Sequence, residues 1–245
     1  MRDLMLYLIG LGLHDEEDLS LKAIIAMKKC NSVFCELYTS RWHGDLNKIE
    51  NIIRKKIEIL SREKVESNFF VNESKSKDIA LLVPGDPLTA TTHIELMIEA
   101  RKQGIDFQVI HSSSIYTAIA ESGLMLYKFG RTTTLAYPEK GYEPKSPYEI
   151  IKENKKVGMH TLVLLDIKEN KNMTIKEGLE LLSKNKAVDN NEKIVACCEL
   201  GSENQVIRYD SASNLTENKE LEKIPAVLII PGKLNFKEEE ALTLL

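Results

Sequence analysis

The segment whose residue types best suit chemistry is PGDPLTATTH, residues 84–93. It directly follows an apolar run, residues 78–83, that has the composition of a buried strand. Open α/β sheets bind ligands at the carboxyl ends of their strands, so this loop is well placed for binding. Asp86 offers a carboxylate suited to an amino group or to ribose hydroxyls, and three threonines add hydroxyl groups. The alternative is that Thr91 only caps the next helix. From the local chemistry we predict a binding loop.

A second polar segment, HSSSIY at residues 111–116, follows another apolar run. Hydroxyl groups and the free N–H groups of a helix start would converge there. A helix cap is an equally good interpretation of its serines. His111 taken alone is more typical of a hydrogen-bonded structural histidine than of a base.

Common catalytic and cofactor patterns do not occur in the sequence. Gly10 and Gly12 follow the first apolar run, but Asp15 stands where a dinucleotide fingerprint has its third glycine, so a tight turn is the better interpretation. There is no Ser/His/Asp pattern, HExxH, P-loop or zinc spacing, and we expect no metal. These observations favour chemistry that depends on binding and orienting substrates rather than on a nucleophilic side chain.

Short apolar runs alternate with longer amphipathic segments, which predicts an α/β fold with covered sheet faces. The expected strands are residues 4–9, 32–36, 57–60, 78–83, 106–110, 132–136, 161–166, 193–198, 205–208 and 226–230. The expected helices are residues 20–29, 46–56, 91–102, 112–121, 148–155 and 175–183. We place the domain boundary after the fifth strand, which gives an N-terminal α/β domain of residues 1–110 and a C-terminal α/β domain of residues 111–245.

Apolar residues make up 43% of the chain and charged residues 29%, with a net charge of −4, which is typical of a globular protein and not of a disordered one. Acidic and basic residues are spread evenly, so a nucleic-acid partner is not expected. No apolar run reaches the ~20 residues that span a membrane. The first 13 residues are interpreted as a buried strand of a cytoplasmic protein, whose four cysteines stay reduced in or near the core.

Six motifs, in this order and combination, resemble a known family. They are LIGLGL at residues 8–13, CELYTS at 35–40, PGDPLTATTH at 84–93, SIY at 114–116, YKFG at 127–130 and PGKL at 231–234. The sequence is similar over residues 6–240 to the diphthine synthases, the diphthamide-pathway branch of the tetrapyrrole methylase superfamily. Its length resembles that of archaeal members.

The resemblance implies two α/β domains with the cofactor in the cleft between them, usually in a homodimer. It implies transfer of methyl groups from S-adenosylmethionine to the amino nitrogen of 2-(3-carboxy-3-aminopropyl)histidine on translation elongation factor 2, as far as the trimethylammonio product. The residues suggest no dedicated general base. A corrin-precursor methyltransferase and a non-catalytic module that binds a translation factor are the alternatives.

Carried onto this chain, the resemblance implies a cofactor site of eight residues: Leu13, Asp86, Thr89, Ser114, Ile115, Leu165, Leu200 and Ala226. Asp86 is the side chain expected to matter most, while apolar members pack around the adenine and the methionine chain. Two positions depart from the family pattern, Glu199 where an arginine is usual and Asn235 where a histidine is usual. The acidic residues 238–240 are expected on an exposed helix face.

Overall fold

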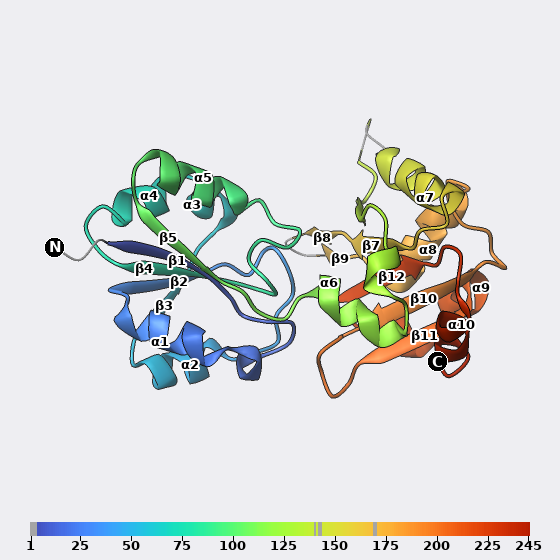
Figure 1. Ribbon diagram of the computed structural model, residues 1–245, viewed down its shortest axis with the longest axis horizontal. Coiled ribbons are helices and arrows are strands. Elements are labelled where there is room, and N and C mark those ends of the chain that lie inside the picture. The colour runs from blue at the N-terminus through green and yellow to red at the C-terminus, as the bar shows by residue number, and fades with distance from the viewer. Residues whose placement is uncertain (1–3, 140, 142–143, 169–170) are drawn as a thin grey trace. The chain divides into compact units, whose positions relative to one another are not determined.

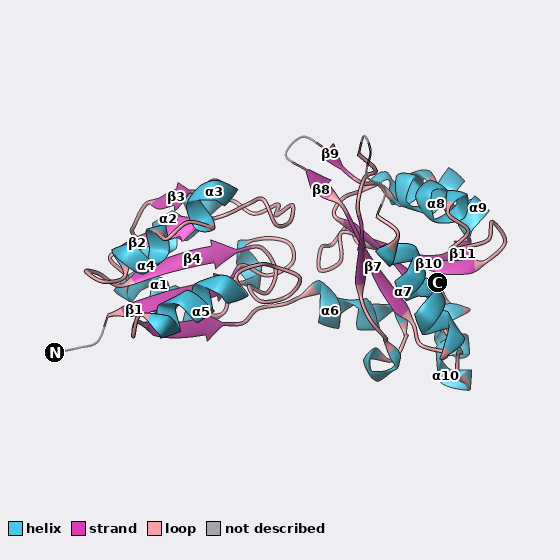
Figure 2. Cartoon of the chain, turned by 90° about the horizontal axis from the view of Figure 1, so that it is seen from above, coloured by secondary structure: helices cyan, strands magenta, loops and turns pink. Residues whose placement is uncertain are grey.

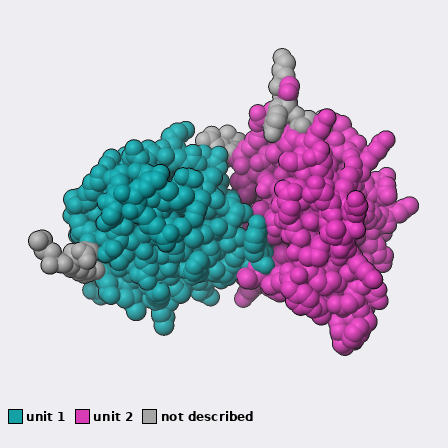
Figure 3. Space-filling model, turned by 45° about the horizontal axis from the view of Figure 1, so that its top comes forward, with its two compact units in different colours: residues 1–116 teal, residues 117–245 magenta. Residues whose placement is uncertain are grey.

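The computed structural model describes residues 4–139, 141, 144–168 and 171–245. The chain divides into two compact units, Met1–Tyr116 and Thr117–Leu245, which Figure 3 colours separately. Each unit contains one five-stranded sheet with helices packed on it (Figure 1). The prediction of an α/β fold with two α/β domains agrees with these two units.

The first sheet is entirely parallel, with the strand order β3-β2-β4-β1-β5. Its strands are β1 (Met5–Gly10), β2 (Ser32–Cys35), β3 (Ile57–Ile59), β4 (Ile79–Val83) and β5 (Asp106–Ile110). Because all five strands run the same way, their carboxyl ends share one edge of the sheet. The loops that leave β1, β4 and β5 are therefore neighbours, and they carry the candidate site.

Helices cover both faces of this sheet (Figures 1 and 2). Successive residues of a strand point to opposite faces, so Leu6 and Leu8 enter one core cluster while Tyr7 and Ile9 enter the other. Residues of α1 (Leu21–Lys29) and α2 (Leu46–Ile53) complete the Tyr7 cluster. The Leu6 cluster is completed by residues of three further helices, α3 (Arg62–Val65), α4 (Phe69–Glu73) and α5 (Ile94–Lys102).

The second sheet is mixed, with the strand order β11-β10-β12-β7-β6. β6 and β7 are parallel, and the other neighbouring pairs are antiparallel. Its strands are β6 (Thr133–Leu135), β7 (Thr161–Leu165), β10 (Lys193–Cys198), β11 (Val206–Ser211) and β12 (Ala226–Ile230). A short pair, β8 (Ile167–Lys168) and β9 (Lys171–Asn172), follows β7.

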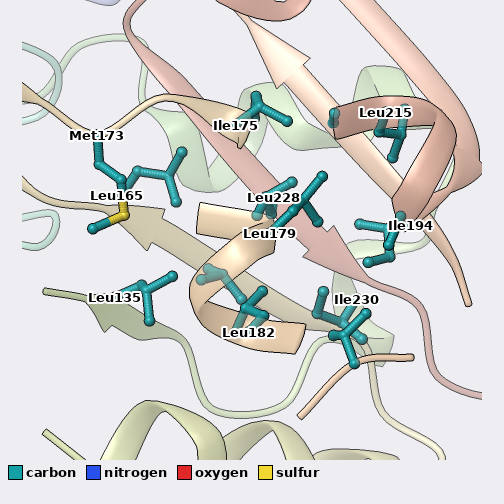
Figure 4. Close-up of a cluster of buried hydrophobic side chains, with 14 of the residues drawn as sticks. Leu135, Leu165, Met173, Ile175, Leu179, Leu182, Ile194, Leu215, Leu228 and Ile230 are labelled. Carbon is teal, nitrogen blue, oxygen red and sulfur yellow. The ribbon is translucent and has the colours of Figure 1, made fainter. Parts of the chain in front are cut away.

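One large apolar cluster joins the second sheet to helices α7 (Ser146–Lys156), α8 (Ile175–Lys184) and α9 (Ala212–Glu217). Figure 4 shows Leu179 and Leu182 of α8 against Leu228 and Ile230 of β12. All four cysteines of the chain are buried thiols outside disulfides, as predicted.

Several helix boundaries differ from the prediction, mainly at polar loops. Residues 112–121 form only a short α6 (Ile115–Ala118) and a 3₁₀ turn, η2 (Ile119–Ser122), because residues 111–114 are held in the loop by side-chain hydrogen bonds. The helix expected from residue 91 begins at Ile94. The short helices α3, α4 and α9 were not predicted, because four to six residues give little periodicity. The C-terminal α10 (Phe236–Leu242) was expected only as a helix face at residues 238–240.

Candidate functional site

The candidate site is a cluster of three loops at the carboxyl edge of the first sheet. The loop after β1 and the loop after β4 are linked by one isolated β-bridge beyond the strands, which we call the rung between Gly12 and Gly85. These two glycines exchange backbone hydrogen bonds of 3.2 and 2.8 Å. Gly12 has a φ of +83°, and a Cβ there would lie 2.1 Å from the Cβ of Asp18. The tight glycine turn predicted for this loop is confirmed, and its close packing excludes a larger residue.

Asp86 connects the loop after β4 to the loop after β5. Its Oδ2 lies 2.7 Å from His111 Nδ1 and accepts the Ser112 N–H at 3.3 Å. Its Oδ1 accepts the Leu88 N–H at 3.1 Å and the Thr89 hydroxyl at 3.4 Å. The carboxylate is almost fully buried, and each of its oxygens has two protein donors. Asp86 therefore fixes the shape of both loops.

Asp18 makes the second connection between loops. Its carboxylate accepts the His14 N–H at 2.8 Å and the Ser113 hydroxyl at 3.2 Å. Ser113 Oγ in turn accepts the Leu13 N–H at 3.1 Å, across 100 residues of sequence. The segment after the first strand thus supplies one carboxylate, that of Asp18, which holds the glycine turn.

The structure brings five of the eight predicted cofactor residues to this edge of the first unit. Leu13 follows the glycine turn, and Thr89 closes the turn begun by Asp86, donating its N–H to the Asp86 carbonyl at 3.1 Å. Ser114 is buried and its Oγ accepts the N–H of Tyr116 at 3.2 Å, so it serves as a helix cap; Ile115, the first residue of α6, is half-buried.

The other three predicted residues lie together in the second unit. Leu165 ends β7, Leu200 follows β10, and Ala226 begins β12. Because β12 is antiparallel to both β7 and β10, these positions share one edge of the second sheet. Leu165 and Leu200 are buried and Ala226 is half-buried. Each unit thus gathers its predicted residues at a single sheet edge.

A buried polar pair beside the loop after β4 was missed as a site feature, although both residues lie in quoted motifs. Glu36 is fully buried, and its Oε2 accepts the N–H groups of Tyr38 and Thr39 at 2.9 and 3.1 Å. His93 Nε2 lies 3.9 Å from Glu36 Oε1. Burial raises the pKa of Glu36 and lowers the pKa of His93, so both groups favour their neutral forms.

The expectation for residues 238–240 was wrong at Glu238, and the second unit shows why. Glu238 is fully buried and forms an ion pair with Lys128 and a 3.0 Å hydrogen bond with His160 Nε2. His160 Nδ1 accepts the Gly232 N–H at 2.8 Å. The YKFG and PGKL motifs therefore meet through a buried charge network.

The two departures from the family pattern have local structural roles. Asn235 caps α10, with its Oδ1 accepting the N–H groups of Lys237 and Glu238 at 2.9 and 3.0 Å. Glu199 occupies a turn after β10 with a φ of +50°, and its N–H donates to Pro225 O at 2.8 Å. Both departures therefore lie beside elements that carry predicted site residues or motifs.

Within the described residues, no group of three or more His, Cys, Asp or Glu side chains is arranged to hold a metal ion. In the same part of the chain, no helix is long and apolar enough to cross a membrane.

Residues 5–216, which include the parallel sheet and the loop cluster, match the family model for the tetrapyrrole (corrin/porphyrin) methylases, and this match defines the class of protein. The chain is also 43% identical to the diphthine synthases of Methanococcus maripaludis and Methanocaldococcus jannaschii, over 97% of this chain and 97% of each relative. A crystal structure of diphthine synthase matches with a TM-score of 0.90 at 33% identity, covering 98% of this chain and 94% of that one. The chain belongs to the diphthine synthase family of the tetrapyrrole methylases.

Proposed function

We propose that this protein is an S-adenosylmethionine-dependent diphthine synthase. It methylates the amino group of the 2-(3-carboxy-3-aminopropyl)histidine of translation elongation factor 2 to the trimethylammonio form. The observation that carries the proposal is the 43% identity to named diphthine synthases over 97% of both chains. The proposal includes a homodimer in the cytoplasm, and these two parts rest on the family resemblance alone.

The donor set of the loop cluster fits such a methyl donor. The edge of the first sheet offers backbone groups beside Leu13 and Thr89 and serine and threonine hydroxyls, which suit an amino group and ribose hydroxyls. The Asp18 and Asp86 carboxylates, whose hydrogen bonds are taken up by the protein, add the negative charge that suits a sulfonium. We propose the eight residues carried over from the family as the cofactor site. In it, Asp86 acts through the loop shape that its four hydrogen bonds impose.

When bound, S-adenosylmethionine supplies a methyl group on a positively charged sulfur. The protein's part is to hold the substrate amine in line with that methyl group and to keep water away, since orientation and the exclusion of water both lower the barrier to such a transfer. Rigid loops serve this purpose. The rung between Gly12 and Gly85 and the Asp86 bridge to the loop after β5 fix three loops relative to one sheet.

The test is mass spectrometry of elongation factor 2 that carries the aminocarboxypropyl histidine, after incubation with this protein and S-adenosylmethionine. A gain of three methyl groups that Asp86→Ala abolishes is the expected result. Asp106→Ala, an exposed aspartate at the opposite edge of the same sheet, is the matched control and should behave as wild type.

Two other outcomes of this experiment would support the two alternative functions. Cofactor binding without a mass change in elongation factor 2 would redirect the activity to a small tetrapyrrole substrate. An absence of cofactor binding by calorimetry would leave a non-catalytic module.

A further inference from the structure

His111 and Asp86 form an oriented acid–histidine pair at the carboxyl edge of the first sheet. His111 Nδ1 lies 2.7 Å from Asp86 Oδ2, and the Asp86 carboxylate is nearly buried while 68% of the His111 side chain is exposed. The Ser112 N–H shares the same carboxylate oxygen at 3.3 Å. The ring is therefore anchored at one nitrogen and open to solvent around the other.

The anchor fixes which nitrogen carries the proton. A carboxylate accepts hydrogen bonds, so Nδ1 is the donor and the neutral ring keeps a free electron pair on Nε2. Within the described part of the chain, no residue forms a hydrogen bond with His111 Nε2. The charged side chains connected to this segment are Asp86 directly and Asp18 through the Ser113 hydroxyl, and both are acidic.

We propose that His111 is the proton acceptor for the substrate amine, with Asp86 as its positioning residue; this inference rests on the proposed methyltransferase function. At neutral pH the amine is an ammonium ion without a free electron pair. Nε2 takes one proton, the nitrogen electron pair forms the N–C bond, and the C–S bond breaks with its electron pair staying on sulfur. The exposed ring then returns its proton to water before the next transfer. Three cycles release three protons and end in the trimethylammonio cation.

The other side chains of the loop cluster suit this task less well. The Asp86 and Asp18 carboxylates are occupied by protein donors. His93 is buried, with Nδ1 3.3 Å from Pro87 O and Nε2 3.4 Å from the Tyr38 hydroxyl. His111 combines an acidic partner, a free nitrogen and exposure at the edge that carries five of the proposed cofactor residues.

The test uses two variants that separate proton transfer from loop bracing. In His111→Asn the amide nitrogen takes the place of Nδ1 and can still donate to Asp86, but Nε2 is absent. His111→Ala leaves a space that added imidazole can enter from solvent. The readouts are calorimetric affinity for S-adenosylmethionine, single-turnover methylation across pH 6–9, and the side-chain ¹⁵N spectrum of histidine-labelled wild type.

We expect His111→Asn to bind S-adenosylmethionine as wild type does and to methylate about 100-fold more slowly at pH 7, the usual range for removal of a general base. Its rate should rise with pH as the amine loses its proton unaided. Imidazole should restore His111→Ala activity, and the ¹⁵N spectrum should show His111 protonated on Nδ1 in its neutral form.

A wild-type rate and pH profile in His111→Asn overturns the proposal, as does a loss of cofactor affinity that accounts for the whole loss of rate. If His111→Asn does not fold, failure of imidazole to rescue His111→Ala overturns it equally. Wild-type protein that methylates nothing overturns the proposed function itself, and this inference with it.

Discussion

Glu36 and His93 face each other inside the first unit, with His93 Nε2 3.9 Å from Glu36 Oε1, although they belong to two different motifs. His93 Nδ1 lies 3.3 Å from the carbonyl oxygen of Pro87, so the His93 ring contacts and stabilises the loop after β4. Glu36 orders its own loop by accepting the Tyr38 and Thr39 N–H groups. This pair explains why CELYTS and PGDPLTATTH occur together: their polar residues build one buried support.

The first prediction concerns the charge state of this support. Burial raises the pKa of Glu36, so the folded state binds the Glu36 proton more tightly than the unfolded state does, and stability falls as pH rises through the folded pKa. Glu36→Gln keeps an acceptor for both N–H groups without the buried charge. We expect the free energy of unfolding of Glu36→Gln, relative to that of wild type, to increase as the pH rises from 5.5 to 8, as measured by urea unfolding.

Glu36→Ala is the matched comparison, because it leaves two part-buried N–H groups without their acceptor. The free energy of unfolding of Glu36→Ala should be about 1–3 kcal/mol lower than that of wild type at pH 5.5 and at pH 8. If Glu36→Gln loses as much as Glu36→Ala, then a charged Glu36 paired with protonated His93 supports the loop instead.

The second prediction concerns Gly12. Gly12→Ala places a Cβ 2.1 Å from Asp18 Cβ and 2.9 Å from Ser113 Oγ, in a backbone conformation with a φ of +83°. Backbone strain and overpacking together should cost about 3 kcal/mol and abolish binding of S-adenosylmethionine. Thermal unfolding and calorimetry measure the two effects.

Gly104→Ala separates strain from contact, because Gly104 has a φ of +67° and no atom within 4 Å of a Cβ. It should cost only about 1 kcal/mol and bind the cofactor normally. Equal losses in the two variants would contradict the view that packing between loops decides the Gly12 position.

Much of the first unit could be predicted from local patterns. Its strands are continuous apolar runs such as residues 79–83, and the loops that follow them are polar and rich in glycine or proline. The parallel order of α/β units then places those loops at one edge. For these reasons Asp86 and Thr89 were identified from sequence as parts of a binding loop.

The pairings between distant residues could not be predicted in this way. His111 and Asp86 are 25 residues apart, and nothing in the spacing of HSSSIY indicates that its histidine meets that carboxylate. Glu238 stands in a run of three glutamates, which is typical of a solvated helix face. Its partner Lys128 lies 110 residues away, and the contact depends on how α10 packs in the second unit.

The third prediction concerns the four hydrogen bonds to Asp86. Asp86→Asn replaces one carboxylate oxygen by an amide nitrogen, which would face the donors at either Leu88 and Thr89 or His111 and Ser112. We expect the affinity for S-adenosylmethionine to fall at least about tenfold, equivalent to about 1.4 kcal/mol. Calorimetry against Asp106→Asn, the exposed control, measures the change. An unchanged affinity would show that the loop keeps its shape without these bonds.

The fourth prediction concerns acid stability in the second unit. Burial by itself raises the pKa of Glu238, but hydrogen bonds from Lys128, two backbone N–H groups and His160 outweigh it and lower the pKa to about 2. A carboxyl whose pKa is depressed by folding contributes stability above its unfolded pKa of about 4.3 and loses it as pH falls toward 2. The shift corresponds to about 3 kcal/mol.

Glu238→Gln should therefore be less stable than wild type by about 3 kcal/mol at pH 7, and the difference should shrink steadily between pH 5 and pH 2. Urea unfolding at several pH values measures this dependence. Glu239→Gln, which removes a neighbouring exposed carboxylate of the same helix, should follow the wild-type curve. A difference between Glu238→Gln and wild type that stays constant from pH 7 to pH 2 would mean that packing, and not the ionised carboxylate, holds α10 to Lys128 and His160.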